Sequence, residues 1–334
     1  MQIVGRFLNV STIYDVRRCK NCQAADDILD GMKLGIKVNA DAESFERITR
    51  SDAPFAEVWF NVNNEHAYTQ LFALMQQRNM RFGLHFWGML DHNIAPNIAY
   101  PDASVVKASM RLIRRTLDIA ASHDCPYVNI HPGAAALAKV DYQKERYDCI
   151  TKPIDIDDAI KLFLENAQSL SAYAKKKHVI LTVETVPFRI TDGWYDDNTR
   201  LTPKNIYELP VSAIVQAARL GLSVANDFCH TAANIIHEDP HAVYTFLYGT
   251  TKLLVEQTRL IHLGFVKRPF NGTDNHDSLD NPVLDTSDAV PNIKQMIELL
   301  TLFKNRTDVW ILVEPKDEHV KNYLLAKKLL EHIR

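Results

Sequence analysis

The stretch VILTVET (179–185) indicates the fold, because a nearly continuous apolar run ends there in a carboxylate, Glu184. Strands buried on both faces of a parallel sheet have such runs, whereas strands with one face in water alternate apolar and polar residues. The stretch VWILVE (309–314) repeats the pattern and ends in Glu314. Both segments therefore predict buried strands of an α/β fold.

Working outward from these two, short β-rich segments alternate with longer stretches of helical periodicity. The clearest helices are predicted at 104–123, with apolar side chains on one face, and at 155–178, with acids first and lysines last. Eight such alternations favour one closed (β/α)8 TIM barrel at 31–334, after an N-terminal extension at 1–30. The predicted strands are 31–39, 56–62, 81–87, 127–131, 179–185, 223–227, 260–266 and 310–314.

Composition is that of an ordinary globular protein. The 334 residues are 46% hydrophobic with a formal net charge of −3, which gives no basic excess pointing to nucleic acid. The charged N-terminus does not read as a signal peptide, and no apolar run approaches the roughly 18 residues of a membrane span. Five scattered cysteines suggest a reducing compartment. We expect a cytoplasmic protein that needs no membrane and no obligatory protein partner.

Two features stand apart from the alternation. Cys19 and Cys22 form a CxxC pair without a second CxxC, so a structural role or none is expected, with half of a metal or redox site as the alternative. The polar and aromatic segment 186–210 follows a predicted strand and is expected to form part of the active-site rim.

Metal-competent side chains recur where the predicted strands end. The C-terminal ends of barrel strands carry the chemistry of this fold, and histidine with carboxylate binds zinc, manganese or iron. A carboxylate inside an apolar strand also needs compensating positive charge. Nine donors suit two or three ions better than one. They are His85, His131, Glu184, Asp227, His230, His262, Asp274, His276 and Glu314.

From 81 to 317 the chain resembles the endonuclease IV group of apurinic/apyrimidinic (AP) endonucleases, within the xylose isomerase-like barrels. The HPG at 131–133 and the DxxH at 227–230 are its more specific motifs, whereas Thr185 stands where the group has asparagine. The resemblance implies three zinc ions, with Glu184 bridging the first two. The implied sets are His85, His131 and Glu184; Glu184, Asp227, His262 and Glu314; and His230, Asp274 and His276.

The first expected function is therefore a metal-dependent hydrolase of phosphoric esters, resembling an AP endonuclease. It would use two or three zinc ions, or manganese, on a phosphorylated small molecule or DNA. Glu184 and Glu314 are the expected catalytic residues. Candidate phosphate contacts, which a solvated surface role explains equally well, are Arg189, Lys267 and Arg268.

Two alternatives remain open. A sugar or sugar-phosphate isomerase or epimerase would need one divalent ion, held by the four-residue set that contains Asp227 and His262, with Glu184 and Glu314 as acid and base. A non-catalytic relic of such a barrel is the second, although the complete donor set argues against it.

Overall fold

The computed structural model describes residues 31–191 and 203–333, and it confirms the predicted barrel. The extension at 1–30, with Cys19 and Cys22, lies outside the described residues, as does the middle of the predicted rim segment. Each of the eight predicted segments contains strand. The strands of the barrel sheet are β1 (Lys33–Leu34), β2 (Ile36–Val38), β3 (Phe55–Asn61), β4 (Arg81–Trp87), β5 (Tyr127–Ile130), β8 (Ile180–Glu184), β9 (Ser223–Asp227), β10 (Thr258–His262) and β13 (Trp310–Leu312).

The sheet closes through the first predicted strand, which is divided at Gly35. β1 pairs in parallel with β13, and β2 pairs in parallel with β3, so the strand order returns to its starting segment. A Cβ at Gly35 would lie 2.6 Å from the Phe55 ring and 2.9 Å from the Phe55 carbonyl oxygen. Only glycine therefore fits where the two ends of the sheet meet.

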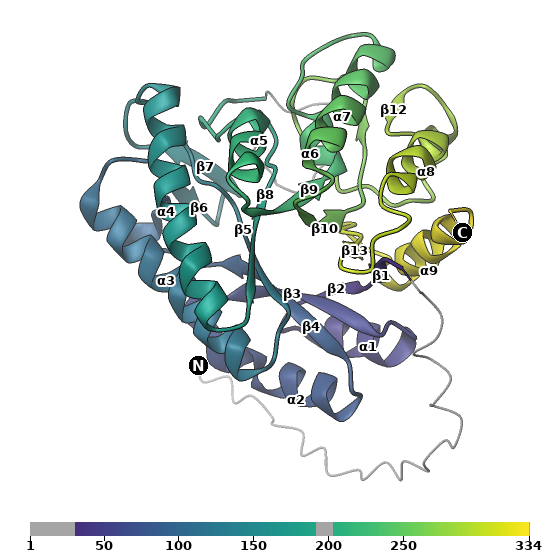
Figure 1. The fold of residues 1–334 in the computed structure, drawn as a ribbon, viewed down its shortest axis with the longest axis horizontal. Helices are drawn as coiled ribbons and strands as arrows, with labels where there is room; N and C mark the ends of the chain where they lie inside the picture. The colour runs from purple at the N-terminus through teal and green to yellow at the C-terminus, as the bar shows by residue number, and fades with distance from the viewer. Residues whose placement is uncertain (1–30, 192–202, 334) are drawn as a thin grey trace, which may run out of the picture. The chain divides into compact units, whose positions relative to one another are not determined.

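The helices surround the outside of this sheet (Figure 1). Both clearly predicted helices are present, and each begins at an aspartate whose side chain accepts a backbone N–H bond, Asp102 for α3 and Asp155 for α4. None of the helices in the described ranges has the length and apolar character to cross a membrane. The helices are α1 (Ala42–Arg50), α2 (Thr69–Gln77), α3 (Ala103–Ser122), α4 (Ile156–Lys176), α5 (Val211–Arg219), α6 (Phe228–Ala232), α7 (Pro240–Leu254), α8 (Ile293–Thr301) and α9 (His319–Glu331).

Two small antiparallel pairs were not anticipated from the sequence. β6 (Ala138–Asp141) pairs with β7 (Arg146–Cys149) in the connection after β5, and β11 (Val266–Lys267) pairs with β12 (Ala289–Val290) after β10. Segments of two to four residues are too short to show a periodicity.

The barrel interior is layered. Alternate residues of a strand face the same side, so the inward positions form an apolar layer and then, two residues further along, a polar layer. Phe55 is followed by Glu57, Tyr127 by Asn129, and Leu260 by His262. The apolar layer is a buried cluster of Phe55, Tyr127, Ala225, Leu260, Trp310 and Leu312, and it forms the floor beneath the functional site.

Candidate metal centre

The structure brings all nine sequence-predicted donors together at the C-terminal ends of the strands. Together with Glu57, which the sequence analysis did not predict, they fall into overlapping sets, and within each set the donor atoms lie within 4.8 Å of one another. The sets are His85, His131 and Glu184; Glu184, Asp227 and His230; His230, Asp274 and His276; and Glu57, His85, His262 and Glu314.

Glu184, at the end of β8, lies at the centre of these sets. Its Oε1 is 3.0 Å from His262 Nδ1 and 3.3 Å from His230 Nδ1, and its Oε2 is 3.4 Å from His85 Nε2. The side-chain amide of Asn129 also donates to Oε2. Burial alone would raise the pKa of Glu184, but the facing His262 and His85 hold that pKa well below its usual value. The buried carboxylate is therefore ionised at neutral pH.

His230 and His276 converge on Asp274. Their Nε2 atoms lie 3.3 and 2.9 Å from Asp274 Oδ2. Each Nδ1 lies near a backbone carbonyl instead, that of Thr185 at 2.8 Å and that of Glu314 at 3.0 Å. A hydrogen bond from Nδ1–H to a carbonyl places the lone pair on Nε2, the nitrogen that faces Asp274, which is how metal-ligating histidines are commonly oriented.

The DxxH motif acquires its geometry from a helix start. Asp227 is the N-cap of α6, and its Oδ1 accepts the backbone N–H of His230 at 2.9 Å. The strand thus presents the carboxylate while the first helical turn presents the imidazole. Asp227 Oδ2 lies 3.5 Å from His230 Nδ1 and 3.7 Å from His262 Nδ1.

The donor set fits divalent metal ions. Imidazole nitrogens and carboxylate oxygens are the ligands of zinc and manganese. His85 Nε2 is fully buried without a hydrogen-bond partner, although it faces Glu184. A buried ring nitrogen costs free energy unless something binds it, and a metal shared with Glu184 would do so.

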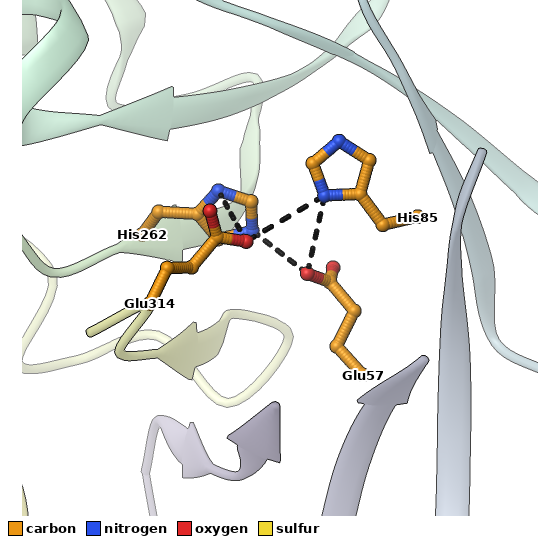
Figure 2. Close-up of side chains that lie close together, drawn as sticks. All are labelled: Glu57, His85, His262 and Glu314. Carbon is orange, nitrogen blue, oxygen red and sulfur yellow. Dashed lines mark hydrogen bonds and ion pairs between the residues drawn. The ribbon is translucent and has the colours of Figure 1, made fainter. Parts of the chain in front are cut away.

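Sequence reasoning missed two charged residues, one in β2 and one in β3. Lys37 and Glu57 are buried in the polar layer, and Glu57 belongs to the four-donor set that Figure 2 shows. Lys37 Nζ lies 2.5 Å from Glu57 Oε1 and also contacts Glu314 Oε1. The signal was present as a lone charge within the apolar runs GIKV and FAEVW, the same signal that identified Glu184.

A cavity of about 460 Å³ opens above the donors. Glu208, which sequence reasoning also missed, lines it from the segment after β8, and its Oε2 is buried without a hydrogen-bond partner. Burial raises the pKa of Glu208 to about 7. Besides the metal donors, the wall includes Trp59, Trp87, Tyr147, Ile190 and Ile206, with Lys37, Arg47 and Lys316 as its basic residues.

The three candidate phosphate contacts are not among the residues that line this cavity. Lys267 Nζ pairs with Asp277 at 2.8 Å, and Arg268 Nε pairs with Asp288 at the same distance. Arg189 lies over the ring of Phe188. Their cationic groups are engaged by neighbours outside the described lining.

The fold occurs in proteins of several activities. A D-tagatose 3-epimerase-like protein has a TM-score of 0.60 and 15% identity, with 90% of this chain and 98% of that chain covered. A D-psicose 3-epimerase from Clostridium cellulolyticum has a TM-score of 0.53 and 13% identity, with 90% of this chain and 95% of that chain covered. Endonuclease IV from Thermus thermophilus has a TM-score of 0.54 and 15% identity, with 90% of this chain and 99% of that chain covered. At these identities the likeness shows a shared fold.

No curated protein shows a significant sequence match to the chain. The model of one family, described as "Xylose isomerase-like TIM barrel", matches residues 38–334. This range contains every donor described above. The chain therefore belongs to the xylose isomerase-like TIM barrel family.

Proposed function

We propose that the chain is a metal-dependent epimerase or isomerase of a sugar or a related polyhydroxy carbonyl compound. One observation carries the proposal: two carboxylates, the buried Glu184 and the partly buried Glu314, converge on Nδ1 of His262, at 3.0 and 3.5 Å, beneath a cavity of small-molecule size. Sugar 3-epimerases recur among the similar structures, which favours this alternative over the phosphoric-ester hydrolase.

The two glutamates supply the acid–base chemistry. One carboxylate would remove the proton from a carbon next to a carbonyl. In an isomerase the same group would then pass that proton to the neighbouring oxygen, and in an epimerase the other carboxylate, after taking up a proton from solvent, would deliver it to the opposite face of the carbon. Nearby positive groups keep the pKa of Glu314 well below its usual value despite burial, chiefly His262 and then Lys37. A divalent ion held by Glu184, Asp227, His262 and Glu314 would polarise the carbonyl oxygen.

The test is exchange of the carbon-bound proton. A panel of ketohexoses, aldohexoses and pentoses is incubated in D2O with the metal-loaded protein and followed by NMR. We expect deuterium next to the carbonyl of at least one sugar, and no exchange with Glu184→Gln or Glu314→Gln. Glu65→Gln, at a glutamate paired with Arg115 outside the cavity lining, is the control and should match wild type. Absence of exchange across the whole panel would contradict the proposal.

A phosphoric-ester hydrolase is the second candidate, because the nine predicted donors include five beyond the four that would hold a single ion. His230, Asp274 and His276 form a complete set without sharing a residue with the Glu314 set. Elemental analysis separates the two: close to three ions per chain supports the hydrolase, and close to one removes its basis. Hydrolysis of abasic-site DNA or of a chromogenic phosphodiester would then identify the substrate class. Metal binding without turnover in either assay would favour the relic barrel.

A further inference from the structure

The imidazole ring of His262 lies between two carboxylates, those of Glu184 and Glu57. Its Nδ1 faces the metal centre, 3.0 Å from Glu184 Oε1, while its Nε2 lies 3.0 Å from Glu57 Oε1 on the opposite side of the ring. A neutral imidazole has one N–H and one lone pair, and the hydrogen bond made by one nitrogen determines which nitrogen can bind a metal. Both facing carboxylates accept when ionised, so once a metal takes the place of the proton on Nδ1, Glu57 holds the remaining proton on Nε2.

Both carboxylate oxygens of Glu57 already have donors within the protein. Its Oε1 accepts from Lys37 at 2.5 Å, and its Oε2 accepts from the Tyr127 hydroxyl at 2.8 Å. The carboxylate is fully buried. An ion at Glu57 would therefore have to compete with these protein donors.

The cation that the four-donor set needs is already in the chain. The Lys37 ammonium donates to two carboxylate oxygens, Glu57 Oε1 and Glu314 Oε1, and its Nζ lies 2.8 Å from His85 Nδ1. Lys37 and Glu57 are register partners in the neighbouring strands β2 and β3, so the backbone places them on the same inward face. Figure 2 shows the side chains of Glu57, His85 and Glu314 turned toward one another.

We propose that the Lys37 ammonium is the resident cation of the set formed by Glu57, His85, His262 and Glu314. Glu57, neutralised by Lys37, is in turn a positioning residue that directs Nδ1 of His262 to the metal centre. This inference rests on the metal-binding part of the proposed function but holds for either reaction. Orienting carboxylates of this kind change metal affinity by about 10- to 100-fold.

The experiment measures metal number and affinity by competition with a fluorescent zinc chelator, together with melting temperature in EDTA. Glu57→Gln is expected to lower the affinity for zinc at least about tenfold with the number of ions unchanged. Lys37→Met removes the ammonium from the four-donor set and is expected to allow one additional ion per chain to bind there. Glu65→Gln and Lys327→Met, from the ion pairs Glu65–Arg115 and Asp52–Lys327, are the matched controls.

Because either single variant leaves a buried charge unpaired, Lys37→Met/Glu57→Gln is made as well. It should keep the wild-type number of ions with the reduced affinity, and it carries the test if a single variant does not fold. One ion fewer in Glu57→Gln would overturn the inference, since Glu57 would then be a ligand. Wild-type affinity in the Gln variants would overturn it too. Failure of the wild-type protein to bind zinc would instead contradict the metal-binding part of the proposed function.

Discussion

Glu184 Oε1 and His262 Nδ1 lie 3.0 Å apart, and both side chains are fully buried. The pair joins β8 to β10 at the centre of the donor sets. Glu184→Gln keeps the shape but removes the charge and the ability to take a proton. We expect kcat to fall at least about 100-fold, the scale of general acid–base catalysis, together with a loss of bound metal. Steady-state kinetics and elemental analysis check this, and near-wild-type turnover would contradict it.

Metal removal should destabilise the protein, and more strongly at high pH. A ligand at about 1,000 times its Kd stabilises a fold by about 4 kcal/mol. Facing carboxylates raise the pKa of His230 and His262 well above the usual range, so bound metal must displace their protons. Affinity should therefore rise with pH. Melting temperatures with zinc and with EDTA, compared at pH 6 and pH 8, measure the effect, and a pH-independent difference would argue against these ligands.

The pH dependence of the metal-free protein should also change with Glu208→Gln. The pKa of Glu208 is raised from 4.5 to about 7 by burial, so its stabilising contribution is complete below 4.5 and is lost as pH rises through 7. Each pKa unit corresponds to about 1.4 kcal/mol. Glutamine stays uncharged, so the variant should gain stability over wild type between pH 5 and pH 8. Thermal melting in EDTA tests this; a constant difference across that range would be the contrary result.

Gly83→Ala should destabilise the barrel. A Cβ at Gly83 would lie 2.4 Å from the Tyr127 ring, which is fully buried in the apolar layer. Overpacking of this kind costs about 1–3 kcal/mol. Gly249→Ala in α7 is the matched control, because its Cβ meets no atom within 4 Å and alanine favours helix by up to about 1 kcal/mol. Chemical denaturation compares the two; equal stability of both variants would refute the packing argument.

The sequence alone predicted the barrel and the face that carries the site. Eight apolar segments of strand length alternate with helices, and this alternation depends on local periodicity that any stretch shows by itself. Glu184 and Glu314 were recognisable because a carboxylate inside an apolar strand needs a partner. The other donors followed from one rule of the fold, since parallel strands in a barrel end at the same face.

Only the tertiary structure decided which charges meet. Lys37 and Glu314 are 277 positions apart, and they contact because the first strand closes the sheet between β3 and β13. Glu57 likewise contacts His262 across the barrel. Local sequence carries no information on such contacts, because inward side chains meet across the barrel only after the ring has closed. The same closure brings Lys37 into contact with both Glu57 and Glu314.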